Sequence, residues 1–204
     1  LIERIRQGGT IVLPILAVAA LAVLIIFERT VFLWRTHVNA DGFAQRLNAL
    51  IGQGEWKESA DICRALGRKP VPRVLLAGIQ VKDMGREHME NALQEAILGE
   101  IPRLERFLST LGILAAIAPL LGLLGTVTGM INTFHTITLY GTGDPRMMSG
   151  GISEALITTM LGLAVAIPVM LCHTVLSRAV ENTIGQMEEK AVAFVNTVFK
   201  TRKV

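Results

Sequence analysis

The chain has 204 residues, of which 51% are hydrophobic and only 18% are charged. Soluble domains carry about 25% charged residues, so this composition argues against a soluble fold. The net charge of +3 is small and the basic residues alternate with acids, which gives nucleic-acid binding no support. Cys63 lies in a polar stretch and Cys172 in an apolar one, so they predict no disulfide framework.

Three stretches lack Lys, Arg, Asp and Glu: residues 8–27, 107–143 and 155–177. Crossing a hydrocarbon core of ~30 Å takes about 20 apolar helical residues, so each stretch can hold one span. The sequence therefore predicts an all-α membrane protein with three transmembrane helices and long cytoplasmic helical extensions. The expected segments are an amphipathic N-terminal segment at 1–9, spans at 10–34, 107–137 and 150–177, a cytoplasmic helical domain at 35–106, a link at 138–149 and a helical tail at 178–204.

The first apolar stretch also resembles a signal peptide, because Arg4 and Arg6 precede it. Its apolar run is longer than the ~7–15 residues of such peptides. Glu28 and Arg29 follow it without a small-residue cleavage site. We therefore expect a retained span.

The basic residues predict the orientation of the spans. Residues 35–106 contain eleven Lys or Arg and residues 178–204 contain five, whereas the link at 138–149 contains one. Positively charged loops stay in the cytoplasm. The long polar stretch and the C-terminus are thus expected in the cytoplasm, and the N-terminus and the link in the periplasm.

Apolar periodicity predicts helices outside the spans. The first is expected at Asp41–Leu50 with Asp41 as its cap, the second at Glu55–Leu66, and a turn at Gly67–Pro70. From Met89 the apolar positions run into the second span without a turn signal, so one long helix is expected, bent at most near Pro102. The tail carries a similar apolar stripe that continues the third span.

Small residues cover one face of the second span and one face of the third. On a helical wheel, the face of the second span occupies an arc of about 120°. Small residues let helix backbones approach closely inside a membrane, so these faces predict helix packing. The second-span face contains Pro119, Gly122, Gly125, Thr126, Gly129 and Thr133, and the third-span face contains Gly151, Ala155, Thr158, Gly162 and Ala166.

The hydroxyl groups of Thr126, Thr158 and Thr159 lie on or beside these faces. A threonine in a span can donate to its own backbone carbonyl one turn earlier, which is a structural role. The clustering of the three residues favours a second interpretation, a path lined by hydroxyl groups. Both interpretations stay open at the level of the sequence.

Glu154 is the only acid predicted to lie deep in a span. A carboxylate in a span costs several kcal/mol and is by default a functional candidate. The alternative is a cap in the first turn of a helix beginning near Gly150, which the helix dipole would favour. Thr158 lies about 40° from Glu154 on the wheel and Thr159 about 140°, so Glu154 and Thr159 cannot face one narrow lumen squarely.

Enzymatic chemistry finds no support. Residues 141–144 read GTGD, as in intramembrane aspartyl proteases, but no second aspartate lies in a span, and a turn explains Asp144 better. His135 and His173 lie near opposite ends of their spans and are expected at the membrane interface. We predict no metal site, no cofactor and no enzymatic activity.

Three runs of sequence carry a family resemblance: PLLGLLGTVTGMI at 119–131, GISEALITT at 151–159 and GLAVAIP at 162–168. They resemble the ExbB/TolQ/MotA proton-channel family, and its ExbB branch in particular. The runs RQGG at 6–9 and GEWKESA at 54–60 are ExbB-like as well, so the resemblance covers essentially the whole chain.

The resemblance implies an inner-membrane homo-oligomer, a pentamer, embedded in lipid. It would surround an ExbD-like single-span partner with an intramembrane aspartate, and proton flow would drive a TonB-type protein in outer-membrane transport. Glu154, Thr126 and Thr159 would take the family's proton-pathway positions, with Thr158 adjacent. Alternatives are a TolQ-like subunit of the Tol-Pal envelope system and a non-conducting membrane scaffold.

Overall fold

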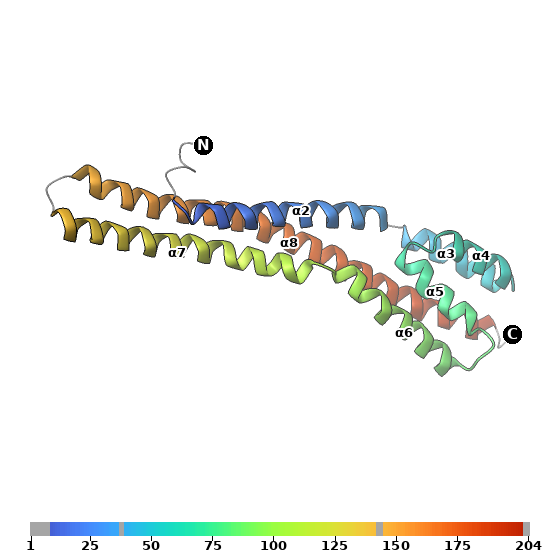
Figure 1. Ribbon diagram of the computed structural model, residues 1–204. Helices are drawn as coiled ribbons and strands as arrows, with labels where there is room; N and C mark the ends of the chain where they lie inside the picture. The colour runs from blue at the N-terminus through green and yellow to red at the C-terminus, as the bar shows by residue number, and fades with distance from the viewer. Residues whose placement is uncertain (1–8, 37–38, 142–144, 202–204) are drawn as a thin grey trace. The chain divides into compact units, whose positions relative to one another are not determined.

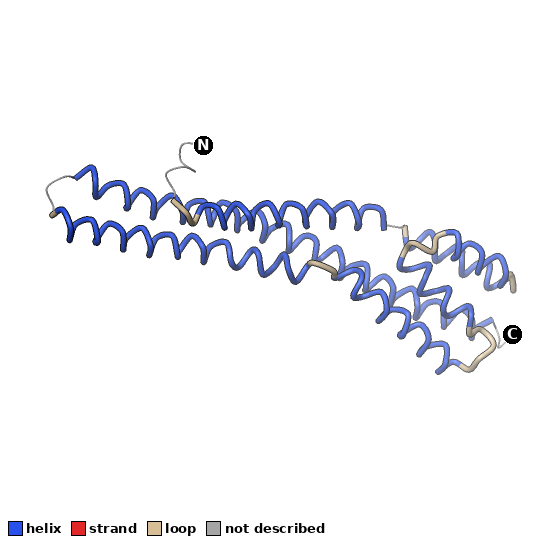
Figure 2. Tube along the Cα trace, viewed as in Figure 1, coloured by secondary structure: helices blue, strands red, loops and turns tan. Residues whose placement is uncertain are grey.

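The computed structural model describes residues 9–36, 39–141 and 145–201, and this part of the chain is α-helical and contains no strand (Figures 1 and 2). The predicted all-α class is thereby confirmed. The expected N-terminal segment lies outside the described residues except for Gly9. The helices are α2 (Val12–Thr36), α3 (Ala40–Gly52), α4 (Trp56–Ala65), α5 (Pro70–Gln80), α6 (Arg86–Glu105), α7 (Leu108–Tyr140) and α8 (Pro145–Thr201).

The chain divides into two compact units. The first, here called the span unit, consists of residues 1–29 and 107–176, and the second, the polar unit, of residues 30–106 and 177–204. The span unit therefore contains most of α2, all of α7 and the first part of α8. The polar unit contains α3 to α6 and the rest of α8.

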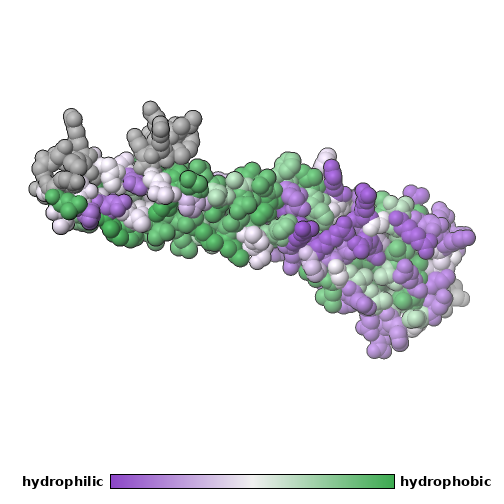
Figure 3. Space-filling view, viewed as in Figure 1, coloured by the Kyte–Doolittle hydropathy of each residue, from purple (hydrophilic) through white to green (hydrophobic). Residues whose placement is uncertain are grey.

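Three helical segments are long and apolar enough to cross a membrane, as predicted. They lie within Val12–Gly52, Arg86–Leu139 and Ser149–Lys200, and their most apolar windows have mean hydropathies of 2.3, 2.2 and 2.3. Only 22%, 28% and 28% of those windows is buried within the chain. Hydrophobic residues accordingly gather on the surface around α2 and α7 in Figure 3. Such exposure suits a lipid environment, because lipid tails are as apolar as leucine.

From residue 112 onward, the large apolar residues of α7 are exposed or half-buried, and its buried positions hold small residues. Leu120 and Leu123 are 61% and 57% exposed, whereas Ala115 and Ala118 are buried. In water the large side chains would be driven inward, but lipid offers no such drive and the closest packing comes from small residues. The exposed large side chains of α7 can thus face lipid, while its small residues let another helix pack closely against its backbone.

Both helices next to the predicted periplasmic link are longer than expected. The helix α7 continues past residue 137 to Tyr140, and α8 begins at Pro145 rather than near residue 150. Asp144, the residue of the GTGD run, lies outside the described residues. At its other end α8 continues as one helix to Thr201.

The prediction of one continuous helix from Met89 into the second span is wrong. The helix α6 passes Pro102 and ends at Glu105, and α7 begins at Leu108. Phe107 between them has a φ of 63°, the left-handed conformation that interrupts a right-handed helix. The guanidinium of Arg29 lies 5.5 Å from the centre of the Phe107 ring. Because this conformation is rare for phenylalanine, the sequence carries no signal for it.

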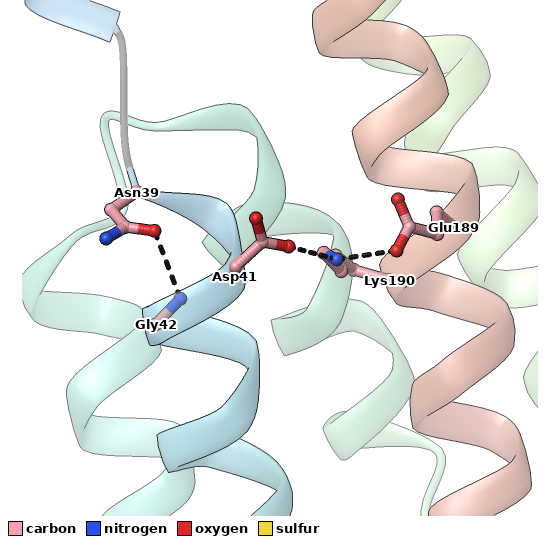
Figure 4. Close-up of polar contacts among 5 residues, drawn as sticks. All are labelled: Asn39, Asp41, Gly42, Glu189 and Lys190. Atoms are coloured by element: carbon pink, nitrogen blue, oxygen red, sulfur yellow. Dashed lines mark hydrogen bonds and ion pairs between the residues drawn. The ribbon is translucent and has the colours of Figure 1, made fainter.

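The polar unit differs from the sequence prediction at two helix starts. Asn39, not Asp41, caps α3, because its side-chain oxygen accepts a hydrogen bond of 3.1 Å from the Gly42 N–H (Figure 4). The expected turn at Gly67–Pro70 leads into an unpredicted helix, α5, in which Pro70 is the first residue. Proline suits that position because its missing N–H would have no partner in the first turn.

The core of the polar unit is closely packed. A Cβ on Gly78 of α5 would lie 2.7 Å from the Phe194 ring of α8 and 2.9 Å from the Leu93 side chain of α6. Phe194 and Leu93 are themselves buried. Glycine at position 78 therefore lets α5, α6 and α8 meet.

Candidate functional site

The helices α7 and α8 run antiparallel and touch through their backbones. A Cβ on Gly162 would lie 2.7 Å from the Ala118 carbonyl oxygen, and one on Gly122 would lie 3.0 Å from the Cα of Thr159. Real Cβ atoms essentially never approach other atoms more closely than 3.0 Å. Gly162 therefore allows an approach that a methyl group would prevent, and a methyl group at Gly122 would force its neighbour to shift slightly.

The same contact continues along both helices. A Cβ on Gly129 would lie 2.9 Å from the Gly151 carbonyl oxygen, and one on Gly125 would overlap the Thr158 side chain. The described glycines of both predicted packing faces thus lie in one seam between α7 and α8. Pro119, also assigned to that face, lies within α7 and is partly buried.

Glu154 lies well inside α8 rather than at its start. The helix begins at Pro145, nine residues earlier, which places Glu154 about 13 Å along the axis at 1.5 Å per residue. The unpaired N–H groups of a helix belong to its first turn only. The alternative interpretation of Glu154 as a first-turn cap is therefore ruled out.

The Glu154 side chain is partly exposed within the single chain and contacts the segment before α2. Its Oε1 atom occupies the position that a Cβ on Gly9 would take. On the seam side, the Thr158 hydroxyl donates to the Glu154 backbone carbonyl at 3.1 Å and to that of Ala155 at 2.9 Å. Glu154 thus lies beside the α7–α8 seam, with its carboxyl group directed towards the start of α2.

The threonine hydroxyls donate mainly to their own helices. Thr126 donates to the Leu123 carbonyl at 2.6 Å, and Thr133 donates to the Gly129 carbonyl at 2.9 Å. Thr159 differs, because its hydroxyl reaches across to the Gly122 carbonyl of α7 at 3.1 Å. Each hydroxyl proton has a backbone acceptor, while the oxygen lone pairs stay able to accept a hydrogen bond.

The structure shows where Glu154 and Thr159 point, which the helical wheel places about 140° apart. Thr158 is fully buried against Gly125, and Thr159 meets the backbone of Gly122. Both threonines therefore face α7, whereas Glu154 lies to one side. Thr126 follows Gly125, which lies against Thr158. Because α7 and α8 are antiparallel, Thr126 lies at the same height along the seam as residues 154–158.

Two contacts of the span unit were not singled out as pairs from the sequence. Gly9 lies against Glu154, and Gly112 of α7 lies under the His173 ring, whose Nε2 would be 3.2 Å from a Cβ there. A small residue opposite a ring can be found only once the partner helix is known. His173 was expected at the membrane interface, and the structure shows it half-buried against α7.

The polar unit contains a separate ionic cluster, which joins α3 to α8. The ammonium group of Lys190 lies between the carboxylates of Asp41 and Glu189, at 2.5 Å and 2.7 Å (Figure 4). Lys190 is buried, and its hydrogen bonds to Asp41 and then Glu189 raise its pKa above the usual value of 10.5. The cation is therefore retained at physiological pH and holds the first turn of α3 against α8.

Other reactive groups of the polar unit are inert or dispersed. Burial raises the pKa of the Cys63 thiol from 9.0 to about 11, so this thiol is protonated at neutral pH. Among the described residues, no group of three or more His, Cys, Asp or Glu side chains could hold a metal ion.

A cavity of about 260 Å³ lies between α6 and α8, with buried Leu93, Ile97 and Val195 in its lining.

Comparison with known proteins identifies relatives that cover from 50% to 92% of this chain. The chain is 34% identical to a biopolymer transport protein ExbB-like 1 of Synechocystis sp. over 86% of this chain and 70% of the relative. It is 29% identical to an ExbB homolog in biopolymer transport from Methanothermobacter thermautotrophicus, over 92% and 66%. It is also 34% identical to the Tol-Pal system protein TolQ of Pseudomonas aeruginosa, over 50% and 45%.

Residues 67–189 match the MotA/TolQ/ExbB proton channel family. This stretch is more than half of the chain and contains α5, α6, α7 and most of α8, including Glu154 and the glycine seam. The resemblance predicted from the motifs is thereby confirmed. This chain belongs to the MotA/TolQ/ExbB proton channel family.

Proposed function

We propose that this chain is a proton-channel subunit of a bacterial inner membrane. Together with an ExbD-like single-span partner, it would convert the proton-motive force into work on a TonB-type protein for outer-membrane transport. Family membership supports the proton-channel role. The similarity to ExbB proteins named for biopolymer transport supports the choice of system.

The observation that carries the proposal is the position of Glu154. It lies inside an apolar helix, beside a seam where glycines bring the backbones of α7 and α8 close together. A carboxyl group there can take up and release a proton, and the lone pairs of the half-buried Thr126 and Thr159 at the same level can accept hydrogen bonds from water. Each proton that crosses 100 mV releases about 2.3 kcal/mol, so a few protons suffice for a mechanical step.

The proposal includes an assembly and an orientation. The exposed apolar surfaces of α2, α7 and α8 can face lipid or further copies of the chain, and the proposed homo-oligomer is a pentamer. No acid occurs in α7, so a continuous proton relay draws on a carboxylate from the partner's span. The N-terminus is proposed to be periplasmic and the C-terminus cytoplasmic, as the distribution of basic residues predicts.

The test is proton flux through the purified complex in liposomes that contain a pH-sensitive dye, driven by a potassium diffusion potential. We expect Glu154→Gln to abolish the flux, because the amide has the same size but does not titrate. Glu95→Gln, which changes an exposed acid of α6, is the matched control and should conduct normally. Normal flux in Glu154→Gln, with normal assembly, would contradict the proposal and favour a non-conducting scaffold.

The match to TolQ supports a second candidate, a subunit of a Tol-Pal envelope system. The two candidates differ in the protein that receives the work. Deletion of the gene should impair TonB-dependent uptake across the outer membrane in the first case and cause detergent sensitivity in the second. Complementation with Glu154→Gln should fail in whichever assay applies.

A further inference from the structure

Gly9 lies in the turn before α2 and has a φ of 63°. This left-handed conformation is open to glycine and strained for residues with a Cβ atom. Gly9 is therefore favoured at this position by its backbone conformation alone.

A second and independent constraint comes from Glu154. A Cβ built on Gly9 would overlap the Oε1 atom of Glu154, and would lie 2.5 Å from its Cδ and 3.3 Å from its Cγ. The overlap includes the carbon of the carboxyl group and not only its outermost oxygen. A side chain at position 9 would thus require the whole carboxyl group to turn away.

We propose that Gly9 is a positioning residue for the Glu154 carboxyl group. The bare backbone of Gly9 covers one side of that group and determines the direction in which it points beside the α7–α8 seam. This inference rests on the proposed function, since it assigns a second residue to the proton step at Glu154. It also makes the turn before α2 part of the functional site.

The two constraints can be separated with other glycines of the same chain. Gly54 and Gly141 have φ values of 80° and 73°, and a Cβ on either would meet nothing within 4 Å. Alanine at those positions therefore adds backbone strain without a new contact. Asparagine at position 9 does the reverse, because it tolerates the left-handed conformation but still places a Cβ against Glu154.

The experiment measures how fast dicyclohexylcarbodiimide modifies position 154 in the full-length protein, purified with its partner and analysed by mass spectrometry. This reagent reacts with protonated carboxyl groups in apolar sites. We expect Gly9→Ala and Gly9→Asn to speed the modification by about two- to tenfold, the range expected when a side chain is forced off its rotamer. Gly54→Ala and Gly141→Ala should react at the wild-type rate.

Proton flux through the same preparations should fall in both Gly9 variants and not in the two controls. A second change isolates the contact further. In a Glu154→Asp background, Gly9→Asn should alter the modification rate less, because the shorter side chain withdraws from the position that Oε1 occupies. If Gly9→Ala does not assemble, Gly9→Asn carries the test alone.

Wild-type modification rates in Gly9→Asn, or equal changes in Gly9→Ala and Gly141→Ala, would overturn the proposal. Failure of the proposed function has a different signature. In that case the Gly9 variants would still change the modification rate, while Glu154→Gln would conduct normally.

Discussion

Replacement of Gly162 by alanine tests the α7–α8 seam most directly. The added methyl group would lie 2.7 Å from the Ala118 carbonyl oxygen and 3.1 Å from the Cα of Gly122. Both are backbone atoms, so no side-chain rotation can relieve the contact. Ordinary van der Waals contact begins at 3.4 Å, so the helices must separate by about 0.7 Å, the difference between 3.4 Å and 2.7 Å.

Two terms determine the expected change in the free energy of unfolding. Overpacking costs about 1–3 kcal/mol. Alanine in place of glycine inside a helix stabilises by roughly 0.5–1 kcal/mol, which offsets part of that cost. Gly162→Ala should therefore lower the free energy of unfolding by up to about 2.5 kcal/mol.

Two glycines of the same helix provide matched controls. A Cβ on Gly150 or Gly185 would meet nothing within 4 Å. Gly150→Ala and Gly185→Ala should thus show only the stabilisation of about 0.5–1 kcal/mol. The assay is reversible unfolding in mixed detergent and dodecyl sulfate micelles, followed by circular dichroism. Equal stability of Gly162→Ala and the two controls would refute the reasoning.

Two further predictions concern the α6–α7 junction and the ionic cluster. At Phe107, the glycine variant should be more stable than the alanine variant by about 1–2 kcal/mol in the same assay, because only alanine keeps a Cβ at a φ of 63°. At the exposed helical position Ser109 the order should be reversed, and the same order at both positions would contradict the conformation of Phe107. Lys190 has a folded pKa above its unfolded value, so its stabilising effect is complete below pH 10.5 and is lost as the pH rises through the folded pKa. Alkaline unfolding measured by circular dichroism should therefore depend less on pH above 10.5 in Lys190→Met than in the wild type, and equal pH dependence would argue against the cluster with Asp41.

Local sequence information was sufficient to predict three apolar helices long enough to span a membrane and to single out candidate site residues. A charge-free run of about 20 residues has few folded outcomes other than a membrane helix, so composition alone predicted three spans. The glycine face of α7 and the acid at position 154 follow from the helical repeat, which depends only on neighbours along the chain.

Tertiary structure decided which of those residues meet. The break at Phe107 depends on a backbone conformation that phenylalanine does not favour, and the ring packs with Arg29 from a distant helix. Sequence left open whether Glu154 begins a helix or lies inside one, and the observed start of α8 at Pro145 decided that question. The contact of Gly9 with Glu154 joins residues far apart in the chain. No local pattern encodes such a contact, because it forms only when the turn before α2 meets α8 in the folded chain.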